Sequence, residues 1–135
     1  MRYHDFHLSG YSVSAFGNRI VLYLIFDYPG RAKEESHIEF SDVACYHFSH
    51  TTAAIITDIR EDSLAAVIQE QQSFLTQAAT QDGLQFWNGP KDTIDTYRER
   101  LKAEGYKAYR IESAIGFSGF VIAKSVVGKT PNQTE

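Results

Sequence analysis

The chain has 135 residues, a formal net charge of −4, and contents of 43% hydrophobic and 13% aromatic residues. This length fits one domain that can bury a core of its own, and the composition is that of a globular chain rather than a disordered one. The acidic balance, with no block of like charges, disfavours nucleic acid as a partner.

Cysteine content and apolar runs restrict the setting of the protein. Cys45 is the one cysteine, so an intramolecular disulfide and a cysteine-built zinc site are excluded. The longest apolar run, residues 20–26, is far shorter than the roughly 20 residues of a membrane span. The start of the chain lacks the pattern of a signal peptide. We therefore expect a cytoplasmic protein that contacts no membrane.

Five strand-like segments precede any helical pattern. The first, residues 6–16, alternates loosely, and Gly17-Asn18 joins it to the apolar run at residues 20–26, which is a strong hairpin signal. The second strand is apolar on both faces, as expected of a central strand that is covered on both sides. Alternating patterns then predict three further strands, at residues 36–43, 44–50 and 53–59.

The period changes after the fifth strand, and two helices are predicted. The first is capped by Asp62 or Ser63 and ends at Asp82-Gly83, and the second is capped by Asp92 or Thr93 and ends before Gly105. Their apolar stripes consist of Leu64, Ile68, Leu75 and Ala79 in the first helix, and of Ile94, Tyr97 and Leu101 in the second.

Strand-like residues return at 106–113 and 119–127, and the glycine-flanked residues 116–119 between them predict a hairpin turn or a kink. The order of five strands, two helices and two strands predicts an α+β domain. We expect a mainly antiparallel sheet of about seven strands with the helices packed on one face. The single domain covers residues 1–127, and residues 128–135 form a mobile tail because they offer no apolar anchor.

The stretch YHDFHLSG (residues 3–10) suggests half of a metal or acid–base site. On a strand, His4 and His7 point to opposite faces, whereas Asp5 and His7 share one, so Asp5 could orient the His7 imidazole. A complete site needs more groups, and His47 is the first candidate to supply one. Asp5, His7 and His47 are therefore candidate catalytic residues, against the alternative of surface histidines with ordinary hydrogen bonds. Nothing in the spacing gathers a ligand set, so no metal site is predicted.

Cys45 is a further catalytic candidate, because strand alternation places His47 on the same face. A nucleophilic cysteine needs an accessible, electropositive setting, and the alternative is a small core residue. No cofactor motif accompanies it. VGKT (residues 127–130) resembles the end of a phosphate-binding loop, but Ala123 stands where that pattern needs its first glycine, so no cofactor is expected.

Aromatic residues crowd the first hairpin and the segment at residues 44–50. Because helices can cover only one face of the sheet, we expect the other face to expose aromatic side chains. Such patches mark binding surfaces, including those used in self-association. Trp87, in a loop with Gly89 and Pro90, either belongs to a binding surface or plugs the junction between the two helices. The candidate binding residues are Tyr11, Tyr23, Tyr46 and Trp87.

Three segments, residues 3–17 (YHDFHLSGYSVSAFG), 38–50 (IEFSDVACYHFSH) and 111–127 (IESAIGFSGFVIAKSVV), together resemble a group of small bacterial proteins of unassigned function. The order of elements is also similar to that of immunity-type domains, which neutralise toxins of competing bacteria. The first resemblance covers most of the chain and carries no catalytic motif, and the second is architectural and implies no residue. Together they imply a bacterial binding protein. They assign no activity and no site residue, because fold likeness alone does not carry function.

Two functional hypotheses follow. The first is a non-enzymatic module that binds another protein or itself as a homodimer through an aromatic-rich sheet face. The alternative is a small enzyme or small-molecule binder with a His/Asp site at one end of the sheet. Nucleic-acid binding is the weakest reading, since it depends on a local basic cluster of Arg98, Arg100, Lys102, Lys107 and Arg110.

Overall fold

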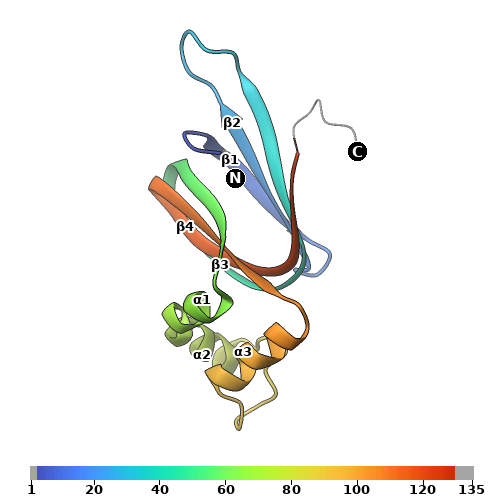
Figure 1. Cartoon of the computed structure of the whole chain (residues 1–135). Helices are drawn as coiled ribbons and strands as arrows, with labels where there is room; N and C mark the ends of the chain where they lie inside the picture. Colours follow the sequence, from blue (N-terminus) through green and yellow to red (C-terminus); the bar gives the residue numbers. More distant parts are fainter. Residues whose placement is uncertain (1–2, 130–135) are drawn as a thin grey trace.

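A computed structural model describes residues 3–129 of the chain. One strongly curved antiparallel sheet carries three helices on its outer side (Figure 1). The sheet order is β1-β2-β3-β4, with an additional pairing between β1 and β3. The elements are β1 (His7–Ser14), β2 (Arg19–Phe26), β3 (Glu34–Asp62), α1 (Leu64–Glu70), α2 (Gln72–Gln81), α3 (Ile94–Ala103) and β4 (Lys107–Lys129).

The α+β class is compatible with this structure, but the prediction of about seven strands and two helices is wrong. Three predicted strands are one continuous strand, β3, and the last two are one strand, β4. The irregular positions between them are register shifts within the ladder rather than turns. Asp42, with a φ of 54°, precedes a register shift between Val43 and Cys45, and the ladder with β4 continues beyond it. A bulge keeps the chain within the sheet and bends it.

β3 and β4 form a long two-stranded ribbon with a sharp corner. The register jumps between His50 and Ile55 on β3, opposite residues 115–117 of β4. Gly116 lies at this corner with a φ of 83°, and a Cβ there would lie 2.6 Å from the carbonyl oxygen of Ala53. The corner therefore depends on glycine, and GFSG forms a kink within β4 rather than a hairpin turn.

Beyond the corner, β3 returns to the start of the sheet, where Leu8 of β1 pairs with Ala54. The sheet thus curls toward a barrel and encloses an inner core built from strands and the N-terminal segment, which includes Leu22, Phe40 and Ile56. The sheet face away from the helices was expected to be open. Curvature instead buries most of that face.

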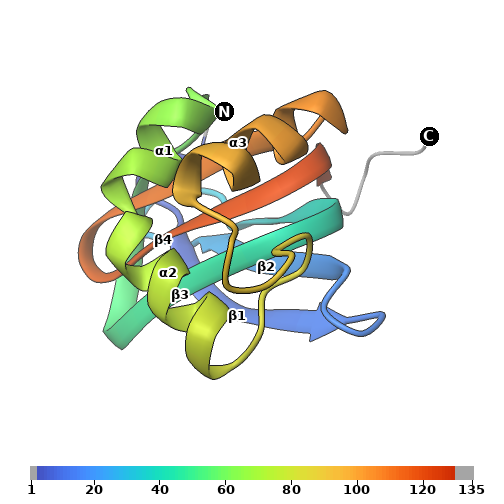
Figure 2. The same ribbon diagram turned by 90° about the horizontal axis from the view of Figure 1, so that it is seen from below.

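A second core lies between the helices and the outer side of the sheet. It joins Leu75, Tyr97 and Leu101 of the helices to Phe120 and Ile122 of β4, among others. The three helices lie over β3 and β4, and the hairpin between β1 and β2 extends beyond the area that they cover (Figure 2).

The helix boundaries follow the predicted caps. The Ser63 hydroxyl accepts a hydrogen bond from the backbone N–H of Ala66 at the start of α1, and Thr93 forms a capping box with Thr96 at the start of α3. The first predicted helix is divided at Gln71 into α1 and α2, although no Gly or Pro occurs there.

The first hairpin is confirmed, because β1 and β2 pair antiparallel on either side of the turn that contains Gly17-Asn18. β2 lies between β1 and β3, as expected of a central strand. Its outer face is covered only in part, since Val21 is buried and Tyr23 is exposed. The expected tail begins inside β4, which includes Gly128 and Lys129, and residues 130–135 lie outside the described residues.

Candidate functional site

Asp5 and His7 lie close in sequence but have separate contacts. Asp5 occupies a turn before β1 with a φ of 69°, so strand alternation does not apply to it. Its carboxylate lies 3.4 Å from Nε2 of His4, and the Tyr28 hydroxyl donates to its carbonyl oxygen. The His7 ring packs on the Tyr28 ring. No hydrogen bond or ion pair between described atoms joins the Asp5 carboxylate to His7.

Cys45 and His47 do share the outer face of β3, where they pair with Ile122 and Phe120 of β4. They have different surroundings, because the exposed His47 ring lies 4.1 Å from the Phe74 ring of α2, whereas Cys45 is buried in the outer core. Burial raises the pKa of the Cys45 thiol to about 12, and its Sγ accepts a hydrogen bond from the Tyr97 hydroxyl at 3.5 Å. A thiol in this state is a poor nucleophile at neutral pH.

No group of three or more His, Cys, Asp or Glu side chains within residues 3–129 is placed to hold a metal ion. Asp5 and His7 lie where β1 begins, and His47 lies beside α2. Asp5, His7 and His47 therefore do not form one shared site. A shared site would need contacts among them, and each instead contacts an aromatic ring or the backbone.

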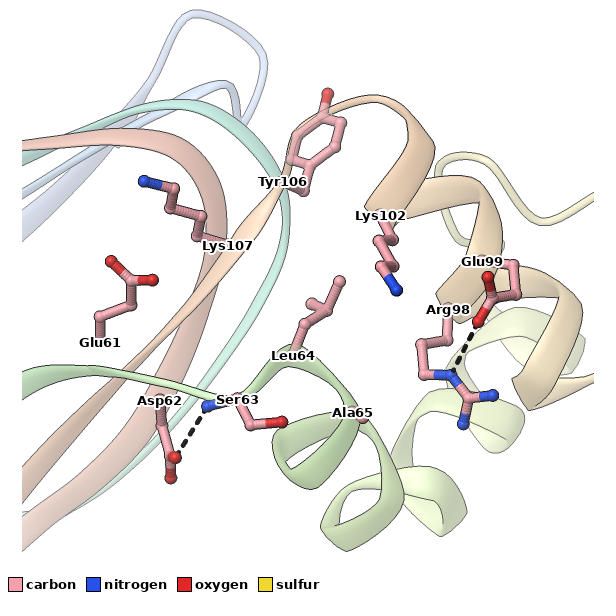
Figure 3. Close-up of a pocket in the computed structure, with 10 residues that line it drawn as sticks. All are labelled: Glu61, Asp62, Ser63, Leu64, Ala65, Arg98, Glu99, Lys102, Tyr106 and Lys107. Atoms are coloured by element: carbon pink, nitrogen blue, oxygen red, sulfur yellow. Dashed lines mark hydrogen bonds and ion pairs between the residues drawn. The ribbon is translucent and has the colours of Figure 1, made fainter.

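A large surface hollow, of about 870 Å³, lies between the start of α1, the side of α3 and the ends of β3 and β4 that meet the helices (Figure 3). Basic and acidic groups balance in its lining, which consists of Glu61, Asp62, Ser63, Leu64, Ala65, Arg98, Glu99, Lys102, Tyr106 and Lys107. Arg98 pairs with Glu99 and with Asp95. Lys102 extends from α3 toward α1 beside Leu64 (Figure 3). The hollow thus has no excess of either charge to select an ion.

The basic cluster that could have bound nucleic acid, defined in the sequence analysis, is also largely neutralised. Arg100 forms a bidentate pair with Asp92, and Arg110 pairs with both Asp62 and Glu70. Together with the ion pairs of Arg98, these contacts offset the charge of the three arginines in the cluster and reduce the local positive charge on which phosphate binding depends.

A group of aromatic rings that reaches the surface lies at the corner of the ribbon. Tyr11 of β1 packs on Phe48 of β3 with ring centroids 5.1 Å apart, and on Phe117 of β4 at 6.0 Å. His50 packs on Phe117 at 5.3 Å, and Tyr46 packs on Phe48 at 5.3 Å. We call these five residues the corner aromatic cluster. Tyr11 is 38% exposed while Phe117 is buried, so the cluster runs from the inner core to the surface.

Glycine and serine residues shape the floor of this cluster. Gly119 pairs with Phe48, and a Cβ at Gly119 would lie 2.6 Å from the Phe48 ring. The Ser113 hydroxyl accepts a hydrogen bond from the Phe117 N–H and donates one to the Phe117 carbonyl oxygen. The glycines of GFSG therefore place the Phe117 and Phe48 rings, a role that the sequence pattern did not assign to them.

The four candidate binding residues lie on three different surfaces. Tyr11 and Tyr46 both pack on Phe48 in the corner aromatic cluster. Tyr23, 44% exposed, lies on the opposite face of the sheet, because it pairs with His37 and Gly10 while Tyr11 pairs with the inner-core residue Leu22. Trp87, in the loop between α2 and α3, packs on Tyr97 of α3 with ring centroids 5.4 Å apart, and its indole N–H donates to the Gly89 carbonyl oxygen.

His50 and Phe117 were not identified as site residues from the sequence. His50 falls at the end of the expected strand at residues 44–50, and Phe117 falls in the expected turn or kink at residues 116–119. The available signal was Phe117 between two glycines, since glycine inside a strand marks close approach of another chain segment.

Comparison with known proteins adds no family to this description. No protein-family model matches the chain, and neither a curated protein nor a solved structure matches it significantly. The resemblance to small bacterial proteins and to immunity-type domains therefore stays a prediction. None of the helices within the described part of the chain is long and apolar enough to span a membrane.

Proposed function

We propose that the protein is a non-enzymatic binding module that contacts a protein partner through the corner aromatic cluster. The observation that supports this proposal is the exposed Tyr11 ring, held edge-on against Phe48 and above the buried Phe117. Aromatic side chains fixed by their neighbours make strong interface anchors, because little conformational entropy is lost when the partner binds.

Exposed apolar side chains lie along β1 and next to the corner in the sequence of β4. Val13 follows Tyr11 on the same face of β1 and is exposed, and Ile115, also exposed, precedes the corner glycine of β4. The exposed Val13 adds apolar area beside the Tyr11 ring, as expected of an interface in which a few anchors carry most of the binding energy.

The surroundings of the other candidate residues favour binding over catalysis. Cys45 is buried with a raised pKa, and no contact among the described residues joins Asp5, His7 and His47. No contact among the described residues specifically favours the alternative, a small enzyme. A cytoplasmic, bacterial setting is part of this proposal. The single, buried Cys45 thiol supports the cytoplasmic part, and the resemblance to small bacterial proteins supports the bacterial part.

The test uses a displayed library of random peptides selected on the wild-type protein. We expect selected peptides to lose roughly tenfold or more in affinity for Tyr11→Ser, since anchors of this kind contribute at least about 1.4 kcal/mol. The control is Tyr23→Ser, which removes a similarly exposed tyrosine from the opposite face. Backbone amide shifts on peptide binding should move around Phe48, His50 and Phe117. Peptides that bind both variants equally, or that map to the hollow of Figure 3, contradict the proposal.

A further inference from the structure

The turn between β1 and β2 presents a phenyl ring fully to solvent. Three successive residues, Ala15, Phe16 and Gly17, have φ values of 53°, 58° and 85°, a conformation that residues with a side chain rarely adopt. Phe16 has 111% of its reference exposure, so its ring buries nothing within the chain. A strained turn that exposes a large apolar side chain does not stabilise the isolated fold, and such features mark functional positions.

A groove of about 520 Å³ begins at this same ring. It lies between the hairpin, β3, the end of α2 and the loop that follows α2. Its walls are mainly apolar and include Val43, Ala44, Tyr46, Phe74, Ala78 and Leu84. Asp82, exposed at the end of α2, lies on the rim. The groove is thus an apolar depression with an acidic edge.

The hairpin carries the charge that matches this rim. Arg19 follows the turn and is half exposed, and its Nε donates to Glu39. The carboxylate of Asp82 forms no ion pair with another described residue. The pair of Arg19 with Glu39 uses Nε of Arg19, and no hydrogen bond to a described residue involves its Nη groups, so these can still reach an Asp82 carboxylate of another molecule.

Phe16 itself borders the groove, so one copy of the chain carries both halves of a contact that a second copy could complete. A twofold axis through such a surface brings the ring of each copy to the groove of the other, which gives a closed, isologous pair. We propose that the chain associates with a second copy of itself in this way, each Phe16 entering the groove of the other copy with Arg19 near Asp82 of that copy. This surface shares Tyr46 with the corner aromatic cluster but does not include Tyr11, Phe48, His50 or Phe117, so a change at Tyr11 tests one proposal without the other.

The test measures the oligomeric state by sedimentation velocity from low micromolar to millimolar concentration. We expect the wild type to dimerise and Phe16→Ser to be monomeric, with the dissociation constant raised several hundredfold or more, because truncating an anchor costs roughly 30-fold per contact and two contacts are lost. Ala78→Arg, which fills the groove, should have the same effect. Tyr11→Ser should leave the dimer unchanged, and so distinguishes this proposal from the proposed function.

Mixing the two variants tests the exchange directly. Phe16→Ser keeps its groove and Ala78→Arg keeps its ring, so an equimolar mixture should form a heterodimer with one of the two contacts, weaker than wild type and stronger than either variant alone. If Ala78→Arg does not fold, Asp82→Arg replaces it at the rim. A wild type that stays monomeric at millimolar concentration, a dimer insensitive to Phe16→Ser, or a mixture no more associated than its components overturns the proposal. The last two outcomes would assign the groove to another occupant.

Discussion

Replacement of Gly116 by alanine should strongly destabilise the protein, because two separate costs coincide at this position. The φ of 83° costs a residue with a side chain roughly 1–2 kcal/mol. The added Cβ would also lie 2.6 Å from the carbonyl oxygen of Ala53 and 2.7 Å from that of Thr52, and relief of such overpacking costs about 1–3 kcal/mol. The expected loss is roughly 2–5 kcal/mol, a large part of the roughly 5–15 kcal/mol available to a domain.

Three other glycines separate these two costs. Gly30 has a φ of 77° with open space around its Cβ position, so Gly30→Ala should cost only about 1–2 kcal/mol. Gly119 has no positive φ, but its Cβ would lie 2.5 Å from the His47 carbonyl oxygen, so Gly119→Ala should cost about 1–3 kcal/mol. Gly10 has neither restriction, and Gly10→Ala should be neutral or stabilise by up to about 1 kcal/mol.

Equilibrium unfolding in urea, followed by circular dichroism, gives the free energy of unfolding of all four variants on one scale. Thermal unfolding should rank them in the same order, with roughly 3–5 °C for each kcal/mol in a chain of this size. The reasoning is refuted if Gly116→Ala is no less stable than Gly30→Ala, since the corner would then adjust to the Cβ without cost. A Gly10→Ala loss as large as that of Gly116→Ala would refute it equally.

Three further predictions concern the helical layer. Cys45 should react with a thiol reagent such as DTNB at pH 8 only after denaturation, because burial raises its pKa to about 12; rapid labelling of the native protein would contradict this. Asp92→Asn should lower the free energy of unfolding at neutral pH and make that free energy decline less in acid. The Arg100 guanidinium and the Asn88 N–H hold the pKa of the Asp92 carboxyl below its usual 3.8 in the folded state. The stabilisation by the Asp92 carboxylate is therefore present above about pH 4 and is lost as the pH falls further. Equal acid sensitivity of the variant and wild type in urea titrations would argue against it. Thr93→Ala should cost about 1 kcal/mol in unfolding free energy through loss of the α3 cap, whereas Thr76→Ala, an exposed change within α2, should cost little.

Local signals in the sequence located the elements whose ends are formed by short-range contacts. Gly17-Asn18 marked a real hairpin, and Thr93 and Gly105 mark the ends of α3, where Gly105 has a φ of 87°. Signals that depend on more distant neighbours were misleading. A residue with positive φ, such as Asp42, serves equally in a turn or a bulge, and only pairing with β4 decides that the strand continues.

Predictions for the candidate site residues likewise succeeded where they depended on local pattern and failed where they depended on distant pairing. Alternation correctly placed Cys45 and His47 on one face of β3, but it failed for Asp5, which precedes β1 in a turn. Tyr11 and Tyr23 were grouped by residue type, whereas the register of β1 against β2, with its shift between Leu8 and Gly10, places them on opposite faces. The corner aromatic cluster joins three strands, and no window of sequence contains such an arrangement.

The continuous β3–β4 ribbon also affects how the chain can reach this structure. Its pairings begin with Asp62 and Ala108, separated by roughly 45 residues that include all three helices, and end with His37 and Lys129, separated by roughly 90 residues. Because the entropic cost of loop closure grows with separation, the end beside the helices should pair first. The far half can then find its register only after the chain has turned at Gly116. We therefore expect slow folding, with a rate set by formation of this corner.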